Sequence, residues 1–90
     1  MKITYDPIKR VKTLTERGLD FDDAPLIFSG PKVTLLDERR DYSEERLVTF
    51  GLLRDRMVAM VWTPRDDAYR IISLRYANDR EIKRYQDRLG

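Results

Sequence analysis

Apolar residues recur at helical spacing in the first part of the chain. A short strand is predicted over residues 2–5, and Asp6-Pro7 then predicts a helix start, because aspartate caps free backbone N–H groups and proline suits the first helical position. The helix is expected to end near Arg17, with Gly18 as the glycine that closes it. Three apolar residues form the stripe of this helix that we expect to be buried: Ile8, Val11 and Leu14.

A second, shorter helix is predicted after Asp20, which can cap its first turn. Pro25 lies inside this segment and has no backbone N–H, so the helix either starts late, near Asp23, or bends at the proline. Five residues are expected to form its apolar side: Phe21, Ala24, Leu26, Ile27 and Phe28.

From residue 32 onward, apolar and polar side chains alternate with the period of two that is typical of β-strands. Strands are predicted over residues 32–36, 45–53, 57–63 and 69–76, with a charged connection over residues 37–43 and hairpin turns over residues 54–56 and 64–68. Connections this short indicate an antiparallel meander. Asn78 and Glu81 then form the capping-box signature of a last helix, which is expected to end at Arg88 or Leu89.

The predicted order is therefore β-α-α-β-β-β-β-α. It indicates an α+β fold, with a mainly antiparallel sheet of about five strands and with helices packed on one face. The bulkier strand residues are expected to face the helices: Val48, Phe50, Leu52, Val58, Met60, Trp62, Ile72 and Leu74. The smaller or polar ones are expected on the open face: Glu45, Thr49, Gly51, Ala59, Thr63, Ser73 and Arg75. A single β-bulge would invert part of this assignment.

Composition narrows the chemistry. Ninety residues make one domain over residues 1–90, and the chain has neither cysteine nor histidine. This excludes disulfides, thiolate or histidine metal sites, a Ser-His-Asp triad and a histidine-dependent ribonuclease. The acidic group Asp20, Asp22 and Asp23 lacks the spaced ligand loop that calcium needs, so no metal or cofactor is expected. No apolar run reaches the roughly 18–20 residues of a membrane span, and a cytoplasmic protein without membrane contact is expected.

The net charge is only +2, but arginines concentrate in residues 54–90, which is compatible with an anionic partner. Arg70 and Arg75 interrupt an apolar strand at positions of opposite parity. Because an unpaired buried charge is costly, both faces of that strand are expected to reach polar surroundings. One of these surroundings is a candidate phosphate-binding site.

An ordered set of short motifs covers nearly the whole chain. It consists of Tyr5-Asp6-Pro7 with Lys9, Gly18-Leu19-Asp20-Phe21 with Ala24 and Phe28, Glu45-Arg46 with Gly51, Thr63, and Arg70-Ile71-Ile72-Ser73-Leu74-Arg75 with Ala77, Glu81 and Tyr85. In these motifs the chain resembles the BrnT-type toxins of bacterial toxin–antitoxin pairs, which are small ribonucleases with a RelE-like fold. The resemblance implies metal-independent cleavage of RNA. It also implies a cognate antitoxin, typically a DNA-binding ribbon-helix-helix protein, and repression of the shared operon by the pair.

The chain departs from the family pattern on the first helix. Where the family usually has an asparagine and then a Lys-His pair before the glycine, this chain has Thr13, Glu16 and Arg17. The loss of a lysine and a histidine, and the gain of a carboxylate, are expected to affect RNA binding or acid/base chemistry more than fold or partner.

Without histidine, RNA can still be cleaved by its own 2′-OH, provided that the protein holds the scissile phosphate, stabilises the added charge and moves protons. Arginine suits the first two tasks because its planar fork matches phosphate oxygens and stays charged. The catalytic candidates are Arg46, Arg75, Glu45 and Tyr85, and Glu81 and Tyr76 are further candidates for proton transfer. The RNA-binding candidates are Lys9, Lys12, Arg17 and Arg70.

Each candidate also has a structural interpretation. Glu81 can serve only the capping box, and Tyr85 can pack between helix and sheet. Arg46 can pair with Glu44 or Glu45, and Arg70 with Asp66 or Asp67. Three functions therefore stay open at this point: a toxin-type endoribonuclease, a catalytically inactive module that binds the antitoxin and co-represses the operon, and a general RNA-binding domain.

Overall fold

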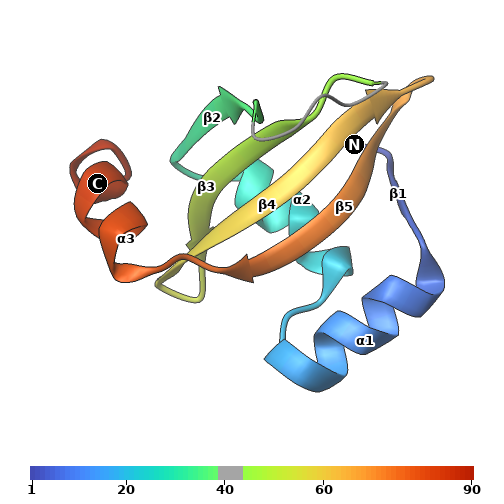
Figure 1. Ribbon diagram of the computed structural model, residues 1–90, viewed down its shortest axis with the longest axis horizontal. Coiled ribbons are helices and arrows are strands. Elements are labelled where there is room, and N and C mark those ends of the chain that lie inside the picture. The colour runs from blue at the N-terminus through green and yellow to red at the C-terminus, as the bar shows by residue number, and fades with distance from the viewer. Residues whose placement is uncertain (39–43) are drawn as a thin grey trace.

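The computed structural model describes residues 1–38 and 44–90; most of the predicted charged connection, residues 39–43, lies outside the described residues. The elements in chain order are β1 (Ile3–Tyr5), α1 (Pro7–Arg17), the 3₁₀ turn η1 (Phe21–Asp23), α2 (Ala24–Ser29), β2 (Lys32–Leu36), β3 (Leu47–Leu53), β4 (Arg56–Arg65), β5 (Ala68–Tyr76), α3 (Asp79–Tyr85) and the 3₁₀ turn η2 (Gln86–Arg88) (Figure 1). Among these residues, no helix is long and apolar enough to cross a membrane.

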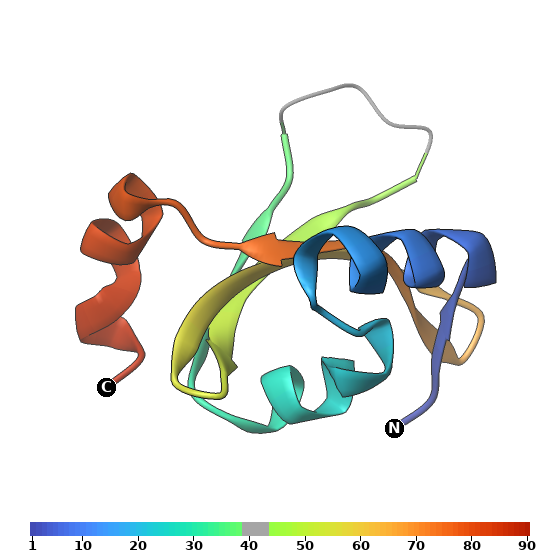
Figure 2. The same cartoon turned by 90° about the horizontal axis from the view of Figure 1, so that it is seen from below.

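The strands form one sheet in the order β1-β5-β4-β3-β2. Strands β2 to β5 pair antiparallel as a meander, whereas β1 pairs with β5 in parallel. This five-stranded sheet confirms the predicted α+β class and the mainly antiparallel pairing. The last helix follows β5 at the left of Figure 1, whereas α1 lies at the lower right, so the two helices stand on different sides of the molecule (Figures 1 and 2).

Local signals place the helix ends. The Asp6 carboxylate accepts a hydrogen bond of 2.9 Å from the Ile8 amide, and Gly18 closes α1 with a left-handed φ of 70°. The predicted ambiguity at Pro25 is resolved by a 3₁₀ turn before α2, which leaves the proline in the first turn of α2. Asn78 and Glu81 form the complete capping box of α3.

One face of the sheet packs against η1 and α2. The buried residues of this core are Leu19, Phe21, Ala24, Ile27, Phe28, Leu53, Val58, Met60, Ile71 and Leu74. Gly51 of β3 allows the close approach of α2, because a Cβ there would lie only 2.8 Å from Ile27 Cγ2. Leu26 was expected in this core but lies outside it, since 56 % of the residue is exposed.

The opposite face packs against α3, so the prediction that the helices cover one face is wrong in part. Tyr85 of α3 stacks on Phe50, with ring centroids 4.5 Å apart. Around this pair lie Val33, Met57, Ala59 and Leu89, with Val48, Leu52, Ala77 and Ile82 at the margin. The sheet therefore has a second, smaller core on the face that the sequence pattern left open.

The register of β3 and β4 explains this difference. Thr49 is opposite Met60 and Gly51 is opposite Val58, so these two residues lie on the α2 face rather than on the open face. Val48, Phe50 and Leu52 lie on the α3 face instead of facing α2. The prediction for these five β3 residues was wrong because it placed the bulkier side chains of every strand on the same face. The turn at Arg54-Asp55 instead fixes which β3 residues are opposite which β4 residues.

A β-bulge changes the face of one further residue. Between β4 and β5 the register shifts at Val61 and Trp62, so that Ser73 is opposite Val61 and Ile71 is opposite Trp62. Ile71 therefore enters the α2 core, where Ile72 was expected. The prediction that Ala59, Thr63, Ser73 and Arg75 share the other face agrees with this register.

Helix α1 contradicts the expectation of a buried apolar stripe. None of its residues 7–17 is buried, and the exposed fractions are 79 % for Ile8, 58 % for Val11 and 40 % for Leu14. Polar contacts attach this helix instead: Arg10 donates two hydrogen bonds to the Asp20 carboxylate, at 2.8 and 2.9 Å. The stripe consequently faces outward.

Candidate functional site

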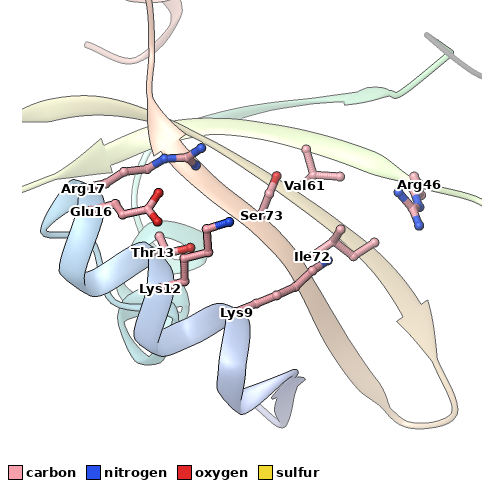
Figure 3. A pocket seen from close by; sticks show the side chains of 9 residues that line it. All are labelled: Lys9, Lys12, Thr13, Glu16, Arg17, Arg46, Val61, Ile72 and Ser73. Carbon is pink, nitrogen blue, oxygen red and sulfur yellow. The ribbon is translucent and has the colours of Figure 1, made fainter.

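A cavity of about 360 Å³ lies between α1 and the sheet, and we call it the α1 cavity. Its lining consists of Lys9, Lys12, Thr13, Glu16 and Arg17 from α1, Arg46 just before β3, Val61 of β4, and Ile72 and Ser73 of β5. Figure 3 shows the Lys12 ammonium, the Glu16 carboxylate and the Ser73 hydroxyl turned toward the same space. Arg46 closes the far side, beyond Val61.

Helical spacing brings the α1 residues together. Lys9, Lys12 and Glu16 are three and four residues apart, so they project from one side of α1 toward the cavity. Arg17 is fixed at the end of the helix, where its Nη1 donates a 2.9 Å hydrogen bond to the Leu74 carbonyl. That carbonyl belongs to a part of β5 beyond residues 69–71, which are the residues that pair with β1. The short first strand thus leaves space for α1 to reach this part of β5.

Backbone contacts hold Arg46 at its place opposite α1. The Thr63 hydroxyl donates to the Glu45 carbonyl, and the Asp37 amide donates to the Arg46 carbonyl at 2.8 Å. Residues from α1, from the start of β3 and from β5 therefore meet at one cavity although they lie far apart in sequence. With four cations and one carboxylate in its lining, the cavity favours an anionic ligand such as a phosphate.

Arg75 and Tyr85 lie together in a different hollow on the same face, beside α3, and we call it the α3 hollow. Its lining consists of Leu35, Leu36, Asp37, Glu38, Val48, Phe50, Arg75, Glu81, Arg84 and Tyr85. Arg75 donates two hydrogen bonds of 2.8 Å to the Glu81 carboxylate, and the side chains are 35 % and 19 % exposed. The α3 hollow thus pairs its central arginine with a carboxylate.

Two further candidates, Glu45 and Arg70, are not among the described residues that line either hollow. The Glu45 side chain is exposed, and its backbone carbonyl accepts from Thr63. Arg70 of β5 is opposite Thr63 of β4, and its charge acts on Glu44. The pKa of Glu44 lies below its usual range, first because Arg65 donates to its carboxylate at 2.7 Å and further because Arg46 and Arg70 are positive.

A network of side chains sets the position of α1. The Asp20 carboxylate caps η1 and accepts from Arg10, and this hydrogen bond lowers the pKa of Asp20. Tyr5 of β1 donates a 2.6 Å hydrogen bond to Asp22, which raises the pKa of the tyrosine. The network joins β1, α1 and η1, and so it positions the helix that carries most of the α1 cavity.

Glu16 is the residue whose place in the site sequence reasoning missed. It was recognised only as a departure from the family pattern, although its spacing of four residues from Lys12 indicates that both share one side of α1. Ile72, Ser73 and Val61 complete the lining through the bulge in β4 and β5. Among the described residues, no group of three His, Cys, Asp or Glu side chains lies close enough together to hold a metal ion.

Comparison with protein families bears directly on this site. A family model described as "Ribonuclease toxin, BrnT, of type II toxin-antitoxin system" matches residues 5–81, a span that includes every residue lining the α1 cavity. The chain belongs to the BrnT family. Membership confirms the resemblance found in the sequence and implies an RNA substrate and an antitoxin partner. No curated protein matches the chain significantly.

Proposed function

We propose that this chain is a toxin endoribonuclease that cleaves RNA without a metal ion and is neutralised by a cognate antitoxin. The observation that carries the proposal is the convergence of Lys9, Lys12, Arg17 and Arg46 around the α1 cavity in a chain of the BrnT family. Three of these groups come from α1 and the fourth from the residue before β3, and they line one cavity that also contains a carboxylate. Such an arrangement matches the needs of phosphate binding and charge stabilisation.

The reaction assigns a task to each kind of group in the α1 cavity. The ribose 2′-oxygen attacks the adjacent phosphorus, and its proton passes to the Glu16 carboxylate. Arg46 and Arg17 stabilise the charge that develops on the non-bridging oxygens. The bond from phosphorus to the 5′-oxygen then breaks, and this oxygen takes a proton from a lysine ammonium or from water. The products are a 2′,3′-cyclic phosphate and a 5′-hydroxyl.

Lys9 and Lys12 are exposed residues in the first half of α1 and contact flanking phosphates in this proposal. Arg70 is kept as a more distant phosphate contact. The catalytic roles first assigned to Arg75, Glu45 and Tyr85 remain predictions, and no step of the proposed reaction requires them. Arg75 in particular has Glu81 as a bidentate partner.

The test is cleavage of an end-labelled RNA of defined sequence by the purified chain in EDTA. We expect specific fragments that end in a 2′,3′-cyclic phosphate, and no cleavage where the attacking ribose is replaced by a 2′-deoxyribose. Lys12→Gln should weaken RNA binding and flatten its salt dependence by about 0.7 in log–log slope, the loss of one single-strand phosphate contact. Lys83→Gln on the exposed side of α3 removes the same charge far from the cavity and should leave binding unchanged. Cleavage that EDTA abolishes would contradict the metal-independent reaction.

A second candidate function is a catalytically inactive module that binds the antitoxin and co-represses the operon. Two observations favour it: the α1 cavity contains the Glu16 carboxylate, whose charge opposes that of the four cations, and Arg75 is paired with Glu81. Under this alternative the RNA stays intact at high protein concentration, while the antitoxin still binds and the complex still binds operator DNA. The same purified chain therefore separates the two functions.

A further inference from the structure

The outward side of α1 carries an apolar surface that the folded chain does not use. It consists of Pro7, Ile8 and Val11, which together with Lys12 form a shallow hollow, and of Leu14 one turn further on. We call these four apolar residues the α1 stripe. Hydrogen bonds of Arg10 and Arg17 attach α1 to the rest of the chain, so the α1 stripe stays exposed in the folded protein. Contiguous exposed apolar residues of this kind mark interaction sites.

We propose that the α1 stripe is the docking surface for an acidic amphipathic segment of the antitoxin, and that the docked segment also covers the α1 cavity. The proposal rests on the proposed function, since it names the partner that closes the same site. It assigns two tasks to one segment: apolar side chains bind the stripe, and carboxylates bind the neighbouring cations.

Lys12 is the physical link between the two surfaces. It lines the shallow hollow together with Ile8 and Val11, and it also lines the α1 cavity together with Glu16 and Ser73. A segment that is seated on the stripe therefore reaches the first cation of the cavity without any movement of the toxin. Lys9 and Arg17 lie on either side of Lys12 along the same helix and also line the cavity.

The charges on α1 favour an acidic partner over a second copy of this chain. A second copy docked on the same stripe would bring its own Lys9 and Lys12 against these lysines, which is repulsive. The stripe itself is also short: it spans Pro7 to Leu14 on one helix, whereas stable interfaces bury roughly 800 Å² per partner. An acidic segment that continues over the cavity gains the additional area and the opposite charge at once.

Mutual exclusion of RNA and antitoxin follows from this geometry. The carboxylates of the docked segment take the positions that RNA phosphates occupy in the α1 cavity. Substitutions on the stripe should therefore release the antitoxin without affecting RNA cleavage, and Lys12 substitutions should weaken the binding of both. This separation distinguishes docking on α1 from inhibition at a distance.

The experiment compares two variants that add the same charge at equally exposed apolar helix positions. Val11 is 58 % exposed within the stripe, and Leu26 is 56 % exposed on α2. The probe is the protein encoded by the reading frame beside this gene, purified as the full chain, and its affinity is measured by titration. Val11→Asp should weaken binding by about 30-fold or more, the size expected for a central interface residue, and Leu26→Asp should bind like the wild type.

RNA cleavage and thermal unfolding are measured on the same variants. Val11→Asp should retain the wild-type cleavage rate and melting temperature, and its cleavage should resist added antitoxin. Unchanged affinity of Val11→Asp, or absence of binding by the wild-type chain, would overturn the docking proposal. So would a wild-type dimer in sedimentation that Val11→Asp dissociates, because the stripe would then serve self-association.

The outcomes also separate this inference from the proposed function. A chain that leaves RNA intact but loses the antitoxin through Val11→Asp retains the docking site and loses the nuclease proposal. A chain that cleaves RNA, and whose Val11→Asp variant binds antitoxin normally, retains the nuclease and loses the docking site.

Discussion

Two neighbouring hollows on one face of the sheet differ in the groups that surround their positively charged side chains. Ser73 of β5 lines the α1 cavity, and Arg75, two residues later on the same strand, lines the α3 hollow. In the α1 cavity, three cations of α1 and Arg46, just before β3, line a shared space with one carboxylate. In the α3 hollow, the guanidinium of Arg75 meets the Glu81 carboxylate through two hydrogen bonds of 2.8 Å.

The difference comes from the helix that covers each hollow. α1 presents Lys9, Lys12 and Arg17 to the sheet, whereas α3 presents the carboxylate of its own capping box. A bidentate carboxylate occupies the fork that would otherwise bind a phosphate. Strand parity therefore places Arg75 on this face, but the covering helix decides that its side chain meets a carboxylate.

The strongest test of this comparison is Glu16→Gln in the α1 cavity. The variant keeps the size of the side chain but removes the proton acceptor of the proposed reaction. We expect the cleavage rate at saturating RNA to fall by about 100-fold or more, the usual contribution of a positioned acid or base. RNA affinity should not fall, because the variant removes a negative charge from a phosphate site.

The matched control is Glu38→Gln, the same substitution at an exposed glutamate that lines the α3 hollow. It should cleave at the wild-type rate. If Glu16→Gln also cleaves at the wild-type rate, the carboxylate is not the base, and the α1 cavity serves binding alone.

Local signals in the sequence were sufficient for the ends of α1, the start of α3 and most strand bounds, whereas α3 ends at Tyr85, before the predicted Arg88 or Leu89. Asp6, Gly18 and the Asn78–Glu81 capping box act within one turn of backbone, so they can be recognised without knowing the rest of the fold. The faces of the sheet could not be predicted in the same way. The register of β3 against β4 depends on the turn at Arg54-Asp55, and the face of Ile72 depends on a bulge that follows from pairing.

The sequence predicted the cations of the α1 cavity as RNA-binding or catalytic residues, but it did not predict that they line one cavity. Lys9, Lys12 and Arg17 were predicted to bind RNA and Arg46 to act on the phosphate, yet no local pattern indicates that they share a cavity. The amphipathic pattern of α1 likewise predicted a buried stripe, whereas Ile8, Val11 and Leu14 are exposed. A prediction of burial fails in this way where an apolar surface serves an interaction instead of the core, as we propose for Ile8 and Val11.

Arg75→Ala tests the α3 hollow and should affect stability more than cleavage. The loss of two charge-assisted hydrogen bonds from partly exposed groups should lower the free energy of unfolding by about 1–2 kcal/mol, which for a chain of this size lowers the melting temperature by roughly 5–15 °C. A thermodynamic cycle with Glu81→Gln isolates the pair, because glutamine still accepts the hydrogen bond of the capping box.

Arg80→Ala, at an exposed position in the first turn of α3, is the control and should change stability by less than about 0.5 kcal/mol. The comparison between the hollows breaks if Arg75→Ala keeps its melting temperature and loses cleavage as strongly as Glu16→Gln. Arg75 would then act on RNA directly, as the sequence first indicated.

The smallest expected effect concerns the network that holds α1 over its cavity. The hydrogen bond from Arg10 holds the pKa of Asp20 below its ordinary value, so the folded chain binds fewer protons there than the unfolded chain. This contribution to stability is present above the ordinary pKa of aspartate, near 4, and is lost as the pH falls through the lower pKa of the folded state. Asp20→Asn keeps a side-chain acceptor for the η1 cap but removes the charge. It should destabilise the chain by about 1 kcal/mol or less at pH 7, and the difference from wild type should shrink as the pH is lowered below roughly 4. Urea unfolding at both pH values measures this, and a difference that stays constant with pH shows that the ion pair does not hold α1 in place.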